Sequence, residues 1–489
     1  MTEKLNVLYA AFEAVPFIKT GGLGDVAGTL PGALKKAGCD VRVMLPKLQS
    51  IPQTYRDEIA RVIEFQMPLG WRNSFCGIDK LEQGGITYYF IENEYYFMRE
   101  NPYGYYDDGE RIAFFSKAVT ESLLHLPDFK CDILHCNDWH TALSPVFLRE
   151  FYKGIPLYDE VKTVFTVHNV KFQGQYSDFM LGDVLGFSGI PAAEDQLRIG
   201  DGAINYMKGA LLYSDVLTTV SPSYAEELKD PFYGEGLDGL FRHRGAVFSG
   251  IMNGIDTEVY NPKTDEMIEA NFSLEDLPGK VQCKAALQKE LGLEEDAELP
   301  LVVMIGRLTE QKGLELVKRV LPEILSAGVQ MAVLGTGDRP YEEMLRHVEL
   351  EHPGRFSAQI RFDEELSHRM YAGADMLLMP SLFEPCGLAQ MIAMAYGTLP
   401  VVRETGGLRD SVIPYNKETG EGNGFSFRNY NAHEMMFTLL NGADVFKNNK
   451  ADWNKLIIQA MRADFSWGKA AEQYRCIYEN LHRGFKDEL

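Results

Sequence analysis

A lysine and three glycines stand together near the N-terminus, in the run Lys19-Thr20-Gly21-Gly22-Leu23-Gly24. Glycine lets a backbone come close to a ligand, and a helix predicted over residues 24–37 would point its first N–H groups at the same place. Lys19, Gly21 and Gly22 are therefore candidates for binding an anionic phosphate. The alternative is a tight turn that only starts a helix. The run also fits the dinucleotide fingerprint, but weakly, because its glycines do not directly follow a strand and no acidic residue ends the second strand.

Two cations lie in a second loop, between Gly306 and Gly313. Arg307 and Lys312 follow a strand predicted over residues 301–305 and precede a helical pattern. From there both can reach a pyrophosphate and neutralise its charge. A metal does this in folds that carry an acidic metal-binding motif, and none is apparent here, so we expect neither a metal nor a cofactor. The alternative is a pair of solvated surface cations.

Two polar side chains follow predicted strands in the first half of the chain. Asp138 comes after the strand 133–136 and His168 after the strand 163–167. Ligands of open α/β sheets gather at the carboxyl ends of strands, so both are candidate site residues. The alternatives are a helix N-cap for Asp138 and a structural hydrogen bond for His168.

These loops belong to a chain in which short apolar strands alternate with helical patterns, which is typical of parallel sheets covered by helices on both faces. The first series of predicted strands is 6–11, 41–45, 86–91, 133–136, 163–167, 216–220 and 247–251. A second series is 301–305, 330–334, 357–360, 376–379 and 399–402. The predicted fold class is therefore α/β, with one domain over residues 1–255 and another over 256–467. Two halves of this kind predict a cleft between them.

Composition limits the classes of partner. The chain of 489 residues has 70 acidic and 48 basic residues and a formal charge of −22, which argues against nucleic acid or an anionic membrane as partner. Seven cysteines are few and odd in number, which favours a reducing, cytoplasmic location. No apolar run approaches the length of a membrane span, and none at the N-terminus resembles a signal peptide. Oligomeric state is open between a monomer and a small homo-oligomer.

Several motifs, taken together and in order, resemble those of bacterial glycogen synthases and plant starch synthases. They are Lys19–Val26, His135-Cys136-Asn137-Asp138-Trp139-His140, Thr166–Asn169, Ser221–Tyr224, Asn253–Asp256, Gly306–Gly313, Pro380–Leu388 and Thr405–Leu408. The resemblance covers nearly the whole chain. It implies the two-domain glycosyltransferase-B (GT-B) architecture, in which two Rossmann-like domains face a deep cleft. It also implies that the C-terminal helix crosses back, so that residues 468–489 pack on the first domain.

The resemblance also implies roles for residues. His168 would contact the donor glucose, Asp138 would lie on the acceptor side, and Glu384 would hold the glucose ring through its hydroxyl groups. Arg307 and Lys312 complete the expected catalytic set. The remaining expected substrate-binding residues are Asn169, Asn253, Cys386, Gly387, Leu388, Thr405, Gly406 and Gly407, with Tyr371 as a residue that stacks on the base. For the glycines that follow Thr405, the alternative is again a turn that starts a helix. Many related retaining transferases carry a second glutamate where this chain has Ile392, and the glycogen synthase group commonly lacks it.

The implied reaction is transfer of glucose from ADP-glucose to an α-1,4-glucan with retention of configuration, with UDP-glucose as the other donor to consider. A front-face mechanism and a double displacement both stay open. Competing interpretations are a sugar-nucleotide epimerase of the same architecture, an oxidoreductase, and a non-catalytic glucan-binding regulator. The oxidoreductase lacks its fingerprint and its ribose-binding acid, and a regulator would not require cations for a pyrophosphate.

Aromatic residues crowd one further stretch, Tyr95–Tyr106. Aromatic faces stack on sugars, so this stretch is a candidate platform for the acceptor. A partly buried aromatic loop explains the pattern equally well.

Overall fold

The computed structural model describes residues 4–126, 128–200 and 202–484. Contacts divide the chain into two compact units. Unit 1 comprises the described residues up to Gly254 together with those from Trp467 onward, and unit 2 comprises Ile255–Ser466. The first and last residues of the predicted first domain, 1–3 and 485–489, lie outside the described residues.

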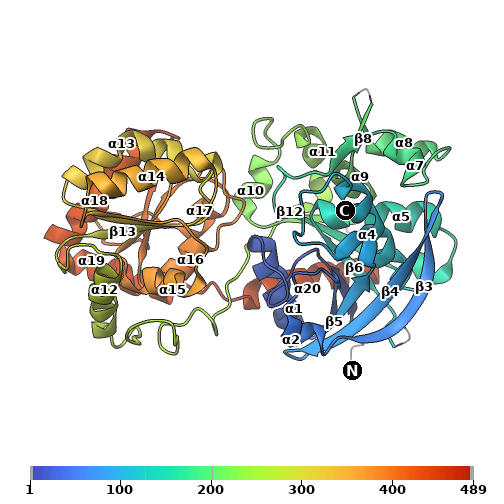
Figure 1. Ribbon diagram of the computed structural model, residues 1–489, viewed down its shortest axis with the longest axis horizontal. Coiled ribbons are helices and arrows are strands. Elements are labelled where there is room, and N and C mark those ends of the chain that lie inside the picture. Colours follow the sequence, from blue (N-terminus) through green and yellow to red (C-terminus); the bar gives the residue numbers. More distant parts are fainter. Residues whose placement is uncertain (1–3, 127, 201, 485–489) are drawn as a thin grey trace. The chain divides into compact units, whose positions relative to one another are not determined.

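Unit 1 is built on a nine-stranded sheet (Figure 1). In spatial order its strands are β12 (Phe248–Gly250), β11 (Val216–Thr219), β7 (Lys162–Val167), β6 (Ile133–Asn137), β1 (Asn6–Ala10), β2 (Asp40–Pro46), β5 (Ile86–Glu92), β4 (Arg72–Gln83) and β3 (Ala60–Leu69). The strands from β12 to β5 are parallel, and β4 and β3 continue the sheet as an antiparallel hairpin. The hairpin is absent from the predicted strands, because β3 is an edge strand whose side chains are largely exposed and whose apolar pattern is weak.

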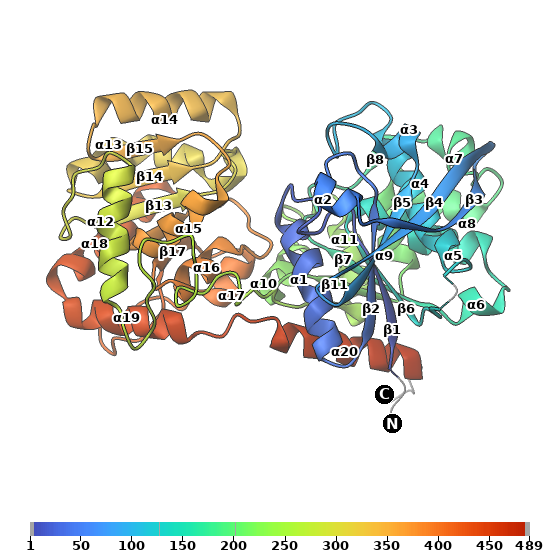
Figure 2. The same ribbon diagram turned by 60° about the horizontal axis from the view of Figure 1, so that its bottom comes forward.

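The helices of unit 1 cover this sheet. They are α1 (Gly22–Lys36), α2 (Gln53–Arg56), α3 (Glu94–Phe97), α4 (Asp108–Ser122), α5 (Leu143–Phe151), α6 (Pro156–Asp159), α7 (Met180–Asp183), α8 (Pro191–Leu197), α9 (Tyr206–Tyr213), α10 (Pro222–Glu227), α11 (Asp238–His243) and α20 (Gly468–Arg483), with 3₁₀ helices η1 (Trp139–Thr141) and η2 (Gly245–Val247). Helix α20 lies beside α1 in both ribbon views, so the C-terminal helix is part of the N-terminal unit (Figures 1 and 2). A small antiparallel sheet joins β8 (Gln175–Ser177), β10 (Ala203–Asn205) and β9 (Arg198–Ile199).

Unit 2 has a six-stranded parallel sheet with helices on both faces (Figure 1). Its strands, in spatial order, are β15 (Phe356–Gln359), β14 (Gln330–Leu334), β13 (Leu301–Ile305), β16 (Met376–Met379), β17 (Leu399–Arg403) and β18 (Phe425–Phe427). Its helices are α12 (Pro278–Glu290), η3 (Glu310–Lys312), α13 (Leu314–Ser326), α14 (Arg339–Glu351), α15 (Glu364–Gly373), α16 (Ala389–Ala395), α17 (Gly406–Ser411), α18 (Ala432–Asn448) and α19 (Lys450–Arg462). The four strands β14, β13, β16 and β17 are buried along their whole length or nearly so, as expected of strands covered on both faces.

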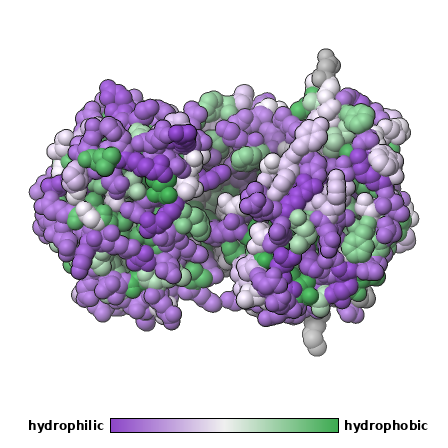
Figure 3. Space-filling model, in the orientation of Figure 1, coloured by the Kyte–Doolittle hydropathy of each residue, from purple (hydrophilic) through white to green (hydrophobic). Residues whose placement is uncertain are grey.

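The surface follows from the composition. On the face shown in Figure 3, hydrophilic residues predominate and apolar residues form scattered patches. Within the described residues, no helix combines the length and the apolar character that a membrane crossing requires.

Candidate active site

Lys19, in the N-terminal loop, forms an ion pair. Lys19 Nζ lies 2.7 Å from Asp25 Oδ1, on the first turn of α1. The loop is also tied to Glu13, whose Oε2 accepts hydrogen bonds from the backbone N–H and the hydroxyl of Thr20. Burial raises the pKa of Glu13, and the hydrogen bonds from Thr20 act against this rise. The buried Glu13 side chain thus restrains the loop at Thr20. The sequence analysis did not predict this role for Glu13.

The glycines of this loop leave open space. A Cβ built at Gly21 or Gly22 would meet no atom within 4 Å, and neither residue has a positive φ. Gly21 is the N-cap of α1 and, as a glycine, has no side chain that could make a capping hydrogen bond. Packing and backbone conformation therefore do not require glycine at these two positions. The space at this helix start suits an anion, and the tight-turn interpretation stays the alternative.

Asp138 adopts an unusual backbone conformation. Its φ is 55° and its ψ is −179°, a region that residues other than glycine rarely adopt. Its Oδ1 accepts from the backbone N–H of His168 at 2.7 Å and from that of Asn169 at 3.3 Å. Asp138 is the N-cap residue of η1, as the alternative interpretation expected, but its side chain makes no capping hydrogen bond there. The carboxylate instead connects the end of β6 to the end of β7.

Both titratable side chains at these strand ends are buried. Burial raises the pKa of Asp138 to about 7, and the hydrogen bonds from His168 and Asn169 counteract part of the rise. Burial lowers the pKa of His168 to about 3, so that its imidazole is neutral at neutral pH. The ring Nε2 lies 2.9 Å from Asn137 Oδ1, another contact that sequence reasoning missed.

The raised pKa predicts how Asp138 affects stability. The folded protein keeps the carboxyl proton up to about pH 7, whereas the unfolded chain loses it near pH 4, so folding takes up a proton between these values. The contribution of Asp138 to the free energy of unfolding therefore falls as pH rises through this window. Asp138→Asn cannot ionise, yet its Oδ1 can still accept both N–H groups. We expect the stability of Asp138→Asn relative to the wild type to improve by about 2 kcal/mol between about pH 5 and pH 8.

Urea denaturation at the two pH values measures this difference. The control is Asp195→Asn, which makes the same chemical change at an exposed position of α8. A relative stability of Asp138→Asn that is the same at both pH values would contradict the prediction.

In unit 2, the structure brings Lys312 and Glu384 together. Lys312 Nζ lies 2.6 Å from Glu384 Oε2, and the hydroxyl of Ser381 donates to the same oxygen at 2.9 Å. Glu384 is buried, while Lys312 is partly exposed at the end of η3. Arg307 is exposed in the same loop. The pair thus presents one cation and one carboxylate at the carboxyl ends of β13 and β16.

Close backbone approaches create this arrangement. Gly313 has a φ of 77°, and a Cβ there would lie 2.2 Å from Pro380 O. A Cβ at Gly406 would lie 2.0 Å from Glu384 O, and one at Gly407 would lie 2.1 Å from Cys386 O. Packing therefore requires glycine at all three positions, in contrast to Gly21 and Gly22. The turn at the start of α17 supports the loop that carries Glu384.

The other expected binding residues of unit 2 lie on or near this loop. Cys386 is buried, Gly387 has a φ of 70°, and Leu388 is half-buried directly before α16. Thr405 is fully buried. The guanidinium of Arg403 donates to Ser381 O at 2.7 Å and to Leu382 O. These two hydrogen bonds restrain the backbone of the loop that carries Glu384. Arg403 is a charged residue at the end of a buried strand, and this signal could have found it.

Two further expected residues, Tyr371 and Asn253, are buried. Tyr371 is buried within α15, with its ring 6.4 Å from that of Tyr396. Asn253 is buried close to the end of the first chain segment of unit 1. Their roles, including stacking of Tyr371 on a base, stay predictions.

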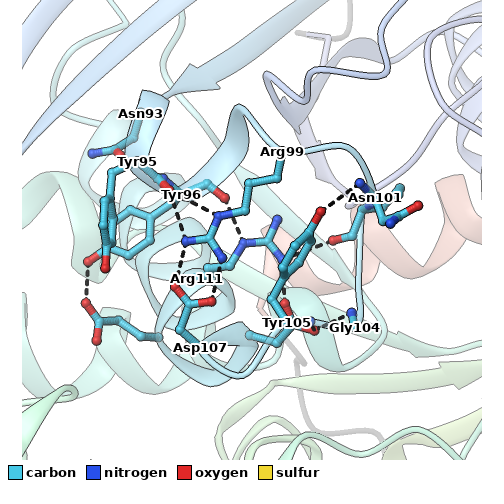
Figure 4. Close-up of polar contacts among 12 residues, drawn as sticks. Asn93, Tyr95, Tyr96, Arg99, Asn101, Gly104, Tyr105, Asp107 and Arg111 are labelled. Carbon is cyan, nitrogen blue, oxygen red and sulfur yellow. Dashed lines mark hydrogen bonds and ion pairs between the residues drawn. The ribbon is translucent and has the colours of Figure 1, made fainter.

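The aromatic stretch combines buried and exposed rings. Arg99 forms a two-pronged ion pair with Asp107, at 2.5 and 2.6 Å, and the guanidinium groups of Arg99 and Arg111 both lie over the ring of Tyr105 (Figure 4). Tyr96 is buried and Tyr103 is half-buried, whereas Tyr95 is 70% exposed and Tyr106 is fully exposed. The buried-loop interpretation holds for the first pair. A platform built on Tyr95 and Tyr106 stays a prediction.

The described residues contain no group of three or more His, Cys, Asp or Glu side chains placed to hold a metal ion.

Comparison with solved structures identifies the fold. The chain superposes on the catalytic domain of starch synthase IV from Arabidopsis thaliana, solved with ADP and acarbose bound, with a TM-score of 0.90 and 34% identity over 99% of this chain and 100% of that one. It matches sucrose-phosphate synthase from Thermosynechococcus elongatus in fold alone, with a TM-score of 0.61 and 16% identity over 98% of this chain and 100% of that one. Residues 6–243 match the family described as starch synthase catalytic domain, and residues 288–439 match glycosyl transferases group 1. The chain is a glycosyltransferase of the GT-B fold, as the sequence predicted.

Curated relatives narrow the class. Glycogen synthase from Clostridium novyi is 48% identical over 98% of this chain and 99% of its own length. Glycogen synthase from Bacillus cereus is 51% identical over 98% of this chain and its own full length. The chain belongs to the glycogen synthase and starch synthase family, which confirms the resemblance.

Proposed function

We propose that this enzyme transfers glucose from ADP-glucose to the non-reducing end of an α-1,4-glucan, with retention of configuration. The glycogen synthases at 48% and 51% identity and the ADP bound to the related starch synthase support this proposal. UDP-glucose is the second donor to test.

The observation that carries the proposal is the Lys312–Glu384 pair, whose atoms lie 2.6 Å apart. A cation at the carboxyl end of a parallel strand can neutralise the charge that develops on a leaving diphosphate. A buried carboxylate beside it can accept hydrogen bonds from the hydroxyl groups of a sugar. One loop pair of unit 2 therefore offers groups for both parts of a nucleotide sugar.

The two units divide the work in this proposal. Residues 256–467 bind the nucleotide sugar, with Arg307 and Lys312 on the diphosphate and Glu384 on the glucose. The loop Cys386–Leu388 and the turn Thr405–Gly407 would shape the sugar pocket through backbone groups, and Tyr371 would stack on the base. Residues 1–255, with 468–489, bind the glucan acceptor.

The polar groups of the N-terminal domain have separate tasks. Lys19, Gly21 and Gly22 would bind phosphate at the open start of α1, where the helix N–H groups favour an anion. His168, Asn169 and Asn253 would line the donor sugar, and Asp138 would lie near the attacking hydroxyl.

The proposal includes a cytoplasmic location and a monomer or a small homo-oligomer. The structure describes all seven cysteines, and none of them forms a disulfide, which suits a reducing compartment.

Incubation with glycogen and ¹⁴C-labelled ADP-glucose or UDP-glucose, in the presence of EDTA, tests the donor and the reaction together. We expect label in polymer that an enzyme specific for α-1,4 bonds releases, and faster incorporation from ADP-glucose. The polymer readout separates transfer from its alternatives. Epimerisation would leave the label in a soluble epimer, and a glucan-binding regulator would leave both donors intact. Either result would contradict the proposal.

A further inference from the structure

The buried side chain of Asn137 lies between the first strand of unit 1 and His168. Asn137 is the last residue of β6 and is fully buried. Its Nδ2 donates to Ala10 O at 3.0 Å. Its Oδ1 accepts from the hydroxyl of Tyr9 at 3.0 Å and lies 2.9 Å from His168 Nε2.

The backbone of β1 fixes the orientation of this amide. A carbonyl oxygen only accepts hydrogen bonds, so Ala10 O requires the NH₂ group of Asn137 on its side. A flipped amide would place two oxygens against each other in a buried site, which is costly. Burial raises the pKa of Tyr9 well above its ordinary value, so its hydroxyl keeps the proton that it donates to Oδ1. The oxygen of Asn137 therefore faces His168.

This orientation determines which nitrogen of His168 carries a proton. A neutral imidazole has one N–H group, and burial keeps His168 neutral by lowering its pKa to about 3. Because Asn137 Oδ1 is an acceptor, the proton resides on Nε2, and Nδ1 has a free lone pair. In the described part of the chain, no hydrogen bond engages Nδ1.

We propose that Asn137 is a positioning residue that holds His168 in the Nε2–H tautomer and so presents Nδ1 as an acceptor to a hydroxyl group of the donor sugar. The contact between His168 and the sugar rests on the proposed function. The inference adds which kind of sugar group can bind at Nδ1. A hydroxyl group can donate to Nδ1. A carboxylate cannot donate, and its charge would face a lone pair. In this proposal the hydroxyl group is the one on C6, where a uronic acid carries its carboxylate, so the site selects a neutral hexose over a uronic acid.

The tautomer is read directly by NMR on the full chain without ligand. Protein labelled with ring-¹⁵N histidine gives separate signals for protonated and unprotonated ring nitrogens, and loss of one pair in His168→Gln assigns His168. We expect Nε2 to be protonated and Nδ1 to be unprotonated at neutral pH. A proton on Nδ1, or on both nitrogens, would overturn the inference, and this measurement needs no variant of Asn137.

Two variants then test the role of Asn137. Asn137→Leu removes the acceptor, so we expect the Nδ1–H tautomer to appear and kcat/KM for the hexose donor to fall by about tenfold, the value of one neutral hydrogen bond. In its neutral form, which burial favours, Asn137→Asp can donate to Ala10 O and still accept from His168, so it should restore the Nε2–H signal. Asn423→Leu removes a similarly buried amide in unit 2 and should leave the His168 signals unchanged. If Asn137→Leu leaves both the tautomer and kcat/KM unchanged, Asn137 has no positioning role.

The readouts separate this inference from the proposed function. If the protein transfers no glucose but shows the expected tautomer, the proposed function is refuted and the assignment of the proton to Nε2 still holds. If an active enzyme uses a nucleotide uronate as well as its hexose counterpart, only the selection of the sugar by Nδ1 is refuted.

Discussion

Lys312→Ala should lower kcat/KM for the sugar nucleotide by about 10²- to 10³-fold while the protein remains folded, since that is the usual cost of losing one group that stabilises charge in a transition state. The side chain is partly exposed, and its partner Glu384 keeps the hydrogen bond from Ser381, so folding should tolerate the change. Steady-state kinetics with saturating glycogen measures the effect. The loss should fall mainly on kcat, because the charge on the diphosphate grows as the bond to the sugar breaks.

The control for this prediction is Lys318→Ala, which removes a lysine from an exposed position of the neighbouring helix α13. It tests whether a general loss of positive charge is enough to slow the enzyme. Activity of Lys312→Ala within about threefold of the wild type would remove Lys312 from its proposed role.

Gly407→Ala should damage both stability and activity. The added Cβ would lie 2.1 Å from Cys386 O, and this neighbour is backbone that cannot rotate away. Overpacking of this kind costs about 1–3 kcal/mol. The loop that carries Glu384 must move to relieve the clash, and a displacement of about 1 Å can reduce catalysis about 10²-fold. We expect a lower Tm and a fall in kcat/KM of that size.

A control variant at a second glycine shows what an added methyl group does where it causes no clash. Gly32 lies within α1, has no positive φ, and leaves open space around the position that a Cβ would take, so Gly32→Ala should raise stability by about 0.5–1 kcal/mol. Differential scanning calorimetry and the same kinetic assay compare the two variants. A Gly407→Ala enzyme with wild-type Tm and kcat/KM would show that the two loops can separate freely.

The sequence predicted the sheet of unit 2 well, because its central strands are buried on both faces and read as continuous apolar runs. Strands β13, β14 and β16 have the predicted bounds. The hairpin β3–β4 could not be predicted in the same way, because one face of its strands is exposed and no continuous apolar run marks them.

The site residues, too, fall into those that the sequence could predict and those that it could not. Residues that follow strands, such as Asp138 and Lys312, could be proposed from position and residue type alone. Asn137 and Ser381 could not, because their importance lies in one partner atom that only the folded chain supplies. Tyr9 and Asn137 are 128 positions apart, and Lys312 and Glu384 are 72 apart. Nor does the sequence reveal that Gly406 and Gly407 serve packing while Gly21 and Gly22 leave space, since this difference depends on neighbouring backbone.

The placement of α20 affects how the protein is made. Because α20 packs on α1 in unit 1, all of unit 2 is inserted within the sequence of unit 1. A ribosome therefore releases every residue of unit 2 before it releases the last helix of unit 1. Unit 2 can fold during synthesis, whereas unit 1 lacks the helix that packs on α1 until translation is nearly finished. A stalled chain that ends near residue 466 should accordingly expose unit 1, rather than unit 2, to proteases and chaperones.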